Sequence, residues 1–206
     1  MSASRDGPPL VPRAGASCEI ERSRSRFLAE LVPVASAERA REVLRETKAR
    51  FPDATHVVHA FVVGPARSVL GSSDDGEPSG TAGRPVLDVL KGSGITNAIL
   101  TVTRWFGGAL LGTGGLVRAY GDAARACIAL VDAEPLVETV RFEVDVSYEI
   151  LEGARRVLSD AGAREVVENF GAEVSLSGLV PADAADGLSR RLTDLSRGRS
   201  IARLSR

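Results

Sequence analysis

A glycine-rich segment between Arg104 and Tyr120 limits the possible folds of this chain more than any other feature. Residues 107–115 contain five glycines in nine positions. Glycine costs about 0.5–1 kcal/mol relative to alanine inside a helix or strand, so this density indicates positive φ angles or a close approach to the main chain. The apolar residues before the segment predict a strand over 96–103, and helical spacing predicts a helix over 116–131. The local order is therefore strand, glycine loop, helix.

The start of that helix is expected to attract anions. We expect Thr113 to be the N-cap, with Gly114 and Gly115 in the first turn, so that unpaired backbone N–H groups face outward. Arg104 before the loop and Arg118 after it add positive charge, and the combination would suit a phosphate group. The spacing matches neither GxxxxGK[ST] nor GxGxxG. The alternative is a tight structural crossover with solvated arginines.

The composition is that of an ordinary globular protein, with 206 residues of which 44% are hydrophobic. Cys18 and Cys127 lie far apart without a CxxC pair, so neither a disulfide framework nor a structural zinc site is expected. No apolar run reaches the roughly 18 residues of a membrane helix, and the start of the chain lacks a secretory pattern. We therefore expect a cytoplasmic protein that does not bind membranes. A net charge of −1 limits any nucleic-acid contact to a local site.

The first part of the chain predicts a tail and a domain. Residues 1–16 are rich in Pro, Gly, Ala and Ser and predict a flexible tail. Residues 17–131 predict the first domain. Its periodicity indicates strands over about 18–23, 26–34 and 56–63, and helices after Ser36 and over about 83–91. His59, on the third of these strands, is expected to be a hydrogen-bonded core or rim residue rather than a general base or a ligand.

The last part of the chain predicts a second domain. Residues 132–137 form a short segment that begins with polar residues and contains a proline, and this composition predicts a linker. Residues 138–206 then give the order strand, helix, strand, strand, helix, strand, which is the ferredoxin-like βαββαβ pattern. This domain contains no histidine or cysteine, so we expect a packing or interaction module. The fold class of the whole chain is accordingly α+β.

A second unusual stretch lies before the glycine-rich segment, at residues 70–83. It places Asp74, Asp75 and Glu77 among Ser, Gly, Pro and Thr, including Ser79 and Thr81, and predicts an irregular acidic loop. Three carboxylates so close in sequence could hold Mg²⁺, because magnesium sites often use one or two carboxylates plus phosphate oxygens. A solvated loop, or carboxylates paired with the two arginines of the glycine segment, would fit the pattern equally well.

Together these two stretches resemble the signature motifs of the YigZ/IMPACT family. Ser73–Gly83 is similar to the first motif and Arg104–Tyr120 to the second, with Trp105 and Phe106 as its usual aromatic pair. The resemblance implies a ribosomal protein S5 domain 2-like first domain, a β-sheet with helices on one face. It implies a second domain similar to the fifth domain of elongation factor EF-G. It also implies a link to translation, because eukaryotic members regulate translation under stress.

The first functional hypothesis is a non-enzymatic binding or regulatory protein of the translation apparatus. RNA or a ribosome-associated factor would bind between the acidic loop and the glycine loop, with phosphates at the arginines and the helix start. Trp105 or Tyr120 could stack on a base, and core packing is the alternative for these aromatic residues. The candidate ligand-binding residues are Arg104, Trp105, Gly107, Gly108, Gly112, Thr113, Gly114, Gly115, Arg118 and Tyr120. The acidic-loop residues are Asp74, Asp75, Glu77, Ser79 and Thr81.

Two further hypotheses use the same residues. In the second, Asp74, Asp75 and Glu77 position Mg²⁺ on a nucleotide for phosphoryl transfer or hydrolysis. No obvious base or nucleophile accompanies the loop, so the sequence favours a protein that is not an enzyme and needs no cofactor. In the third, the carboxylate loop is a lid that pairs with Arg104 and Arg118, and both motifs are structural. We expect a monomer or weak oligomer.

Overall fold

We determined the architecture from a computed structural model, which describes residues 8–205. The chain forms two compact units, Met1–Leu136 and Val137–Arg206, each with its own apolar core. The first seven residues of the predicted tail lie outside the described part. Within residues 8–205, no helix is long and apolar enough to cross a membrane.

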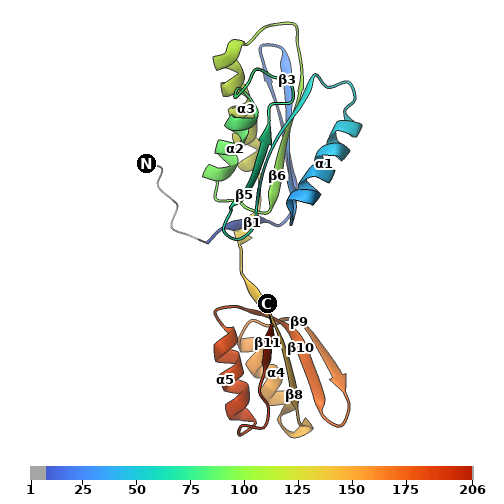
Figure 1. Cartoon of the computed structure of the whole chain (residues 1–206), viewed down its shortest axis with the longest axis vertical. Helices are drawn as coiled ribbons and strands as arrows, with labels where there is room; N and C mark the ends of the chain where they lie inside the picture. Colours follow the sequence, from blue (N-terminus) through green and yellow to red (C-terminus); the bar gives the residue numbers. More distant parts are fainter. Residues whose placement is uncertain (1–7, 206) are drawn as a thin grey trace. The chain divides into compact units, whose positions relative to one another are not determined.

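The first unit is built on a five-stranded antiparallel sheet with the order β2-β3-β6-β4-β5 (Figure 1). The central strand β6 is buried along almost its whole length, and it confirms the strand predicted over 96–103 with its bounds moved two residues along the chain. The predicted strand 56–63 is confirmed as β4. The elements of this unit are β1 (Leu10–Pro12), β2 (Ala16–Arg22), β3 (Ser25–Pro33), α1 (Ala37–Arg50), β4 (His56–Val63), β5 (Val69–Ser73), α2 (Gly83–Gly92), β6 (Ala98–Trp105), α3 (Gly112–Ile128) and β7 (Ala133–Pro135).

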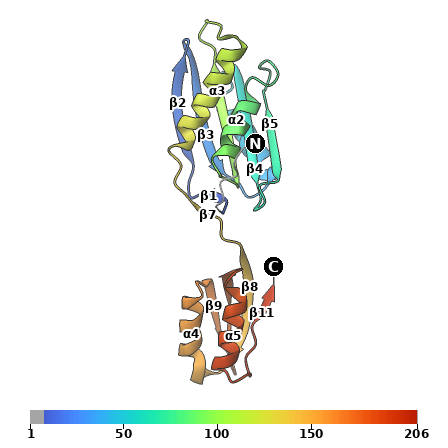
Figure 2. The same cartoon turned by 90° about the vertical axis from the view of Figure 1, so that its left-hand side faces the viewer.

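Helices cover both faces of this sheet. Helices α2 and α3 bury Val58, Ala60 and Leu100 on one face, whereas α1 packs over Phe61 and Ile99 on the other (Figures 1 and 2). The expectation of helices on one face is therefore wrong for α1. The physical reason is that β4 and β6 carry apolar residues at successive positions, so both of their faces need cover.

The predicted tail and linker pair with each other. Leu10–Pro12 lies within the predicted tail 1–16 and Ala133–Pro135 within the predicted linker 132–137, yet they form the antiparallel strands β1 and β7. Arg13 also forms an ion pair with Glu134, with Nη2 and Oε2 2.9 Å apart. The flexible tail is therefore wrong for residues 10–12. The boundary between the two units does lie within the predicted linker, after Leu136, but Ala133–Pro135 forms a strand of the first unit. Local composition cannot reveal that each segment supplies the other's hydrogen-bond partners.

The second unit is a four-stranded antiparallel sheet with the order β11-β8-β10-β9, covered by two helices. This order confirms the predicted ferredoxin-like βαββαβ domain and the α+β class. Alternation along β8 turns Phe142 and Val144 toward the helices, while Arg141 and Glu143 stay exposed. Its elements are β8 (Thr139–Val146), the 3-10 helix η1 (Tyr148–Ile150), α4 (Leu151–Asp160), β9 (Arg164–Phe170), β10 (Val174–Pro181), α5 (Ala185–Leu195) and β11 (Arg203–Ser205).

One end of the first sheet gathers both sequence motifs. Strands β3 and β4 begin there, at Ser25 and His56, and β5 and β6 end there, at Ser73 and Trp105. We call it the loop end. The irregular loop predicted over 70–83 is wrong for residues 70–73, which pair with β4 as part of β5. The acidic loop therefore follows β5 and leads into α2, and the glycine loop follows β6 and leads into α3. The two helices therefore start at the same end and run side by side over one face of the sheet (Figure 2).

The core that faces α2 and α3 can be tested with a pair of leucines. We expect Leu100→Ala to lower the free energy of unfolding by about 2–5 kcal/mol, because Leu100 is fully buried. Leu110 is 91% exposed, so Leu110→Ala should change the free energy of unfolding by less than about 0.5 kcal/mol. Urea unfolding followed by the fluorescence of Trp105, the single tryptophan, measures both. Equal stabilities of the two variants would contradict this core.

Candidate functional site

A buried ion pair joins the two motifs at the loop end. Arg104, from the end of β6, donates from Nη1 to Oε1 of Glu77 in the acidic loop over 2.6 Å. The two side chains are only 7% and 3% exposed. Removing such charges from water costs several kcal/mol per ion, so the pair requires further hydrogen bonds to be stable. Arg104 thus faces inward, toward the fold, and its charge is already neutralised.

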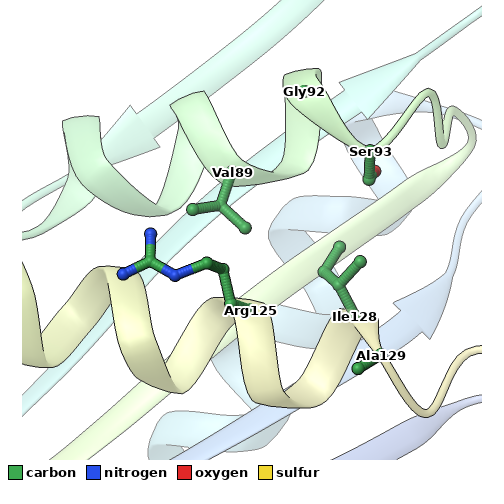
Figure 3. A pocket seen from close by; sticks show the side chains of 6 residues that line it. All are labelled: Val89, Gly92, Ser93, Arg125, Ile128 and Ala129. Carbon is green, nitrogen blue, oxygen red and sulfur yellow. The ribbon is translucent and has the colours of Figure 1, made fainter.

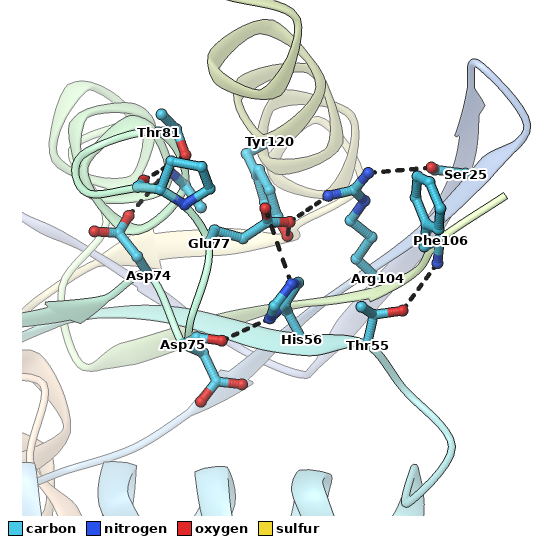
Figure 4. A network of polar contacts seen from close by, with 12 residues as sticks. Ser25, Thr55, His56, Asp74, Asp75, Glu77, Thr81, Arg104, Phe106 and Tyr120 are labelled. Atoms are coloured by element: carbon cyan, nitrogen blue, oxygen red, sulfur yellow. Dashed lines mark hydrogen bonds and ion pairs between the residues drawn. The ribbon is translucent and has the colours of Figure 1, made fainter. Parts of the chain in front are cut away.

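Two hydroxyl groups supply some of these hydrogen bonds (Figure 4). Tyr120 of α3 donates to Oε1 of Glu77 over 2.7 Å, and Arg104 Nη2 donates to Ser25 Oγ over 3.3 Å. Burial and the bond to Glu77 raise the pKa of Tyr120, so its hydroxyl stays protonated and remains a donor. Its ring is fully buried and packs edge-on against Phe27, with centroids 5.2 Å apart. Of the two alternatives for Tyr120, core packing is the one observed.

His56 is partly exposed at the edge of the buried group, and the sequence analysis missed it. Its Nδ1 lies 2.7 Å from the carbonyl oxygen of Asp75, and its Nε2 lies 4.0 Å from Oε2 of Glu77. The signal that could have found it is strand pairing, because His56 lies opposite Arg104 in the register of β4 and β6. The sequence drew attention to His59 instead. His59 lies on the face toward α1, and its Nδ1 is buried without a partner among the described atoms.

Asp74 caps the start of α2 from within the acidic loop. Its carboxylate accepts the backbone N–H groups of Gly80, Ala82 and Gly83 over 2.8–3.0 Å. Burial alone would raise the pKa of Asp74, but the three backbone hydrogen bonds outweigh it and hold the pKa below the usual value. An anion therefore already occupies the positive end of this helix.

The other acidic-loop residues have separate partners as well. Asp75 accepts the backbone N–H of Val57 over 2.7 Å and pairs with Lys48 of α1. Thr81 donates to the Pro78 carbonyl, and Ser79 is exposed. The three carboxylates thus point to different partners. Among residues 8–205, no three His, Cys, Asp or Glu side chains are placed to hold a metal ion.

The glycine loop shows both of the backbone reasons expected of it. A Cβ at Gly107 would lie 1.8 Å from the carbonyl oxygen of Arg24, so only glycine allows this loop to pack on the turn between β2 and β3. Gly108 and Gly112 have φ angles of +80° and +68°, which L side chains rarely adopt. Gly114, by contrast, has open space where a Cβ would lie.

Helix α3 begins without a capping side chain. It starts at Gly112, with Leu111 in the N-cap position and no side-chain hydrogen bond to the first turn. The prediction of Thr113 as N-cap is wrong, because the helix begins earlier and Thr113 lies inside its first turn. Gly112, Thr113 and Gly114 are all exposed, and Gly115 is half-buried. The first-turn backbone is thus open to solvent rather than covered by apolar side chains.

Two exposed arginines lie on segments next to the glycine loop. Arg118 is exposed six residues after the start of α3, and Arg24 is exposed on the turn whose main chain touches Gly107. In the described part of the chain, neither has a carboxylate within 4.0 Å, whereas Arg125 pairs with Asp122. Together we call Arg24, Phe106, the backbone of residues 112–114 and Arg118 the glycine-loop surface. Arg24 was missed because its neighbourhood depends on the β2–β3 turn folding back onto Gly107.

Trp105 does not belong to that surface. Its indole N–H donates to Asp53 over 2.9 Å, and the Arg26 guanidinium lies 3.9 Å from its ring centroid. Phe51 packs edge-on against the same ring at 5.4 Å. Trp105 is therefore half-buried among its own neighbours, and one of the two residues expected to stack on a base is engaged elsewhere.

A hollow of about 450 Å³ lies at the opposite ends of α2 and α3, between their last turns (Figure 3). Val89 and Ile128 form its apolar floor, and Arg125 lies along its side. It is lined by none of the residues singled out in the two motifs. The candidate site is thus the glycine-loop surface and the ion-paired group behind it.

Comparison with known proteins places this geometry in a family. The Impact N-terminal domain matches residues 23–128, which include both motifs, and a domain of unknown function, DUF1949, matches 144–199. The chain belongs to the IMPACT family. It is 36% identical to an IMPACT family member of Haemophilus influenzae, over 95% of this chain and 96% of that one. It is 35% identical to IMPACT family member YigZ of Escherichia coli, over 92% and 94%. A crystal structure of a hypothetical protein matches with a TM-score of 0.69 at 34% identity, over 97% of both chains.

The buried ion pair predicts a large stability effect. Glu77→Gln should lower the free energy of unfolding by about 3–5 kcal/mol, because it leaves the Arg104 guanidinium buried without a countercharge. Asp88→Asn, which removes the exposed pair with Arg84, is the matched control and should cost less than about 1 kcal/mol. Urea unfolding followed by Trp105 fluorescence measures both. A Glu77 variant as stable as its control would contradict the role of the pair.

The Asp74 cap predicts a pH dependence. A lowered folded-state pKa means that ionised Asp74 stabilises the fold above its unfolded pKa, about 3.9, and that this contribution disappears as the pH falls through the folded value. Asp74→Asn should therefore be less stable by about 1–3 kcal/mol at neutral pH, because the amide loses the charge and one of the two acceptor oxygens. The difference should shrink in acid below about pH 4. Thermal unfolding across pH tests this. A difference that stays constant in acid would be inconsistent with an ionised cap.

Proposed function

We propose that this IMPACT family protein is a non-enzymatic regulator that binds RNA of the translation apparatus through the glycine-loop surface. The observation that carries the proposal is the exposed, uncapped start of α3, in a segment that also includes the exposed Arg118 and contacts the turn of the exposed Arg24. Neither arginine has an acidic partner in the described chain. Backbone N–H groups at a helix start and guanidinium groups are the donors that phosphate groups prefer. Because RNA of the translation apparatus is cytoplasmic, the proposal requires the same location for this protein.

A comparison with the start of α2 supports anion binding at the start of α3. Both helices begin at the loop end of the same sheet, and their dipoles favour negative charge there. At α2, the Asp74 carboxylate accepts three backbone N–H groups. Helix α3 has no such internal anion in the described structure, so an external anion can take the equivalent place. A phosphate group fits because it carries several acceptor oxygens.

The ion-paired group behind the surface has a positioning role in this proposal. Arg104 is bound to Glu77, so the phosphate contacts fall to Arg118 and Arg24 rather than to Arg104. The acidic loop is likewise engaged within the fold, which favours binding over magnesium-dependent phosphoryl transfer. A ribosome-associated protein factor remains the alternative partner, and the experiment below separates it from RNA.

Charge reversal at Arg118 tests the proposal. We expect Arg118→Glu to weaken binding of a fluorescein-labelled single-stranded RNA by about tenfold or more, since a hydrogen bond to a charged group contributes about 1.5–3 kcal/mol. Arg45→Glu is the matched control, because Arg45 is exposed on α1, which covers the other face of the sheet. Fluorescence anisotropy measures the affinity of both variants.

The salt dependence distinguishes RNA from a protein partner. Wild-type affinity should fall steeply from about 50 to about 200 mM salt, because phosphate contacts release counterions. In a plot of the logarithm of the binding constant against the logarithm of the salt concentration, Arg118→Glu should reduce the slope by about one. The proposal would be contradicted if Arg118→Glu and Arg45→Glu lost equal amounts of RNA affinity, or if the wild type bound no RNA. Capture of a ribosomal protein factor without RNA would then favour the alternative partner.

A further inference from the structure

Phe106 is the aromatic residue of the second motif that the fold leaves available. Tyr120 is fully buried, and Trp105 is held by Asp53 and Arg26. Phe106 is 46% exposed, although it lies between the buried Arg104 and the tightly packed Gly107. A large exposed aromatic side chain at the edge of a cationic surface is a feature that ligands use.

The backbone on both sides of the ring is fixed. The N–H of Phe106 donates to Thr55 Oγ1 over 3.0 Å (Figure 4). The N–H of Gly107 donates to Ser25 Oγ over 3.2 Å. Gly107 itself packs against the main chain of Arg24. Because these contacts anchor the residue before any ligand arrives, less conformational entropy is lost when a ligand contacts the ring.

A guanidinium group stands behind the ring. The Cζ of Arg104 lies over the Phe106 ring at 5.5 Å from its centroid, and at the same distance from the Phe27 ring. The ion pair with Glu77 and the bond to Ser25 hold that guanidinium in place. One face of the Phe106 ring is therefore supported from within the fold, and the face turned away from Arg104 is the one that a flat ligand would cover.

We infer that Phe106 is a stacking platform for one unpaired base of an RNA whose phosphates lie at the start of α3. The inference rests on the proposed function and narrows its ligand to single-stranded segments, because the bases of a duplex are already stacked on one another. Stacking on an aromatic side chain tolerates any base, so the surface should prefer unpaired over paired RNA rather than one sequence. Phe106 would be a binding residue and Arg104 its positioning residue.

Other exposed apolar side chains of the second motif define the competing explanation. Leu110 is 91% exposed and Val117 is 41% exposed, so this segment could bury apolar groups of a protein. The two arginines favour RNA, because a purely apolar contact does not need them. Replacing the ring by a leucine separates the two cases, since leucine keeps an apolar contact and removes the flat π surface.

The experiment compares Phe106→Leu, Phe106→Tyr and Leu110→Ala in the full chain. The probes are a fluorescein-labelled oligouridine, an oligoadenine and an RNA duplex, and Trp105 emission gives a second readout beside the site. We expect Phe106→Leu to weaken binding of both single strands by about five- to a hundredfold, and Phe106→Tyr and Leu110→Ala to bind within about twofold of the wild type. Duplex binding should be weaker and unaffected by Phe106→Leu.

The outcomes separate this inference from the proposed function. If Arg118→Glu weakens RNA binding but Phe106→Leu binds like the wild type, the stacking platform is refuted while the proposed function holds. Equal affinity for duplex and single strands would also refute it. If no RNA binds the wild type, both fail together. Circular dichroism and urea unfolding of Phe106→Leu, compared with Phe106→Tyr, ensure that a loss of binding reflects the missing ring.

Discussion

The buried ion pair between Arg104 and Glu77 is the interaction on which the rest of the loop end depends. It joins the end of β6 to the acidic loop. Tyr120 of α3 donates a hydrogen bond to the same Glu77 carboxylate, so α3 is attached to the pair as well. Such a pair is costly to desolvate, and the hydroxyls of Tyr120 and Ser25 offset part of that cost. Three segments of the chain are thereby held in one arrangement, which fixes where each loop leaves the fold.

The two motifs consequently have different roles. The acidic loop is directed inward, since Asp74 caps α2, Asp75 binds the β4 backbone and Glu77 pairs with Arg104. The glycine loop packs against the Arg24 main chain at Gly107, and it is exposed to solvent at residues 112–114. The hypothesis of a carboxylate lid on both arginines is thus right for Arg104. For Arg118, the described chain provides no such pair. The acidic-loop side chains thus have their partners within the fold, and this holds the backbone beneath the glycine-loop surface in one conformation.

Local patterns predicted the elements well and their partners poorly. Apolar runs gave β4 and β6, and alternation and helical spacing gave the second domain. The pairing of β1 with β7 was missed, because their residues are far apart in sequence and each has an unremarkable composition. The exchange of roles among Trp105, Phe106 and Tyr120 was missed for a similar reason. Trp105 ends β6, Phe106 follows it and Tyr120 lies on α3, and only their packed neighbours decide which ring is left exposed.

The sequence by itself determined most of the elements, the α+β class, and the presence of a loop that needs glycine, because these follow from local periodicity and backbone sterics. Only the tertiary structure decided which partner each charged side chain takes. Arg104 meets Glu77 across 27 positions and Ser25 across 79. Contacts over such separations depend on strand order and register, which no single segment encodes. The same long-range order left the start of α3 uncapped and the ring of Phe106 exposed.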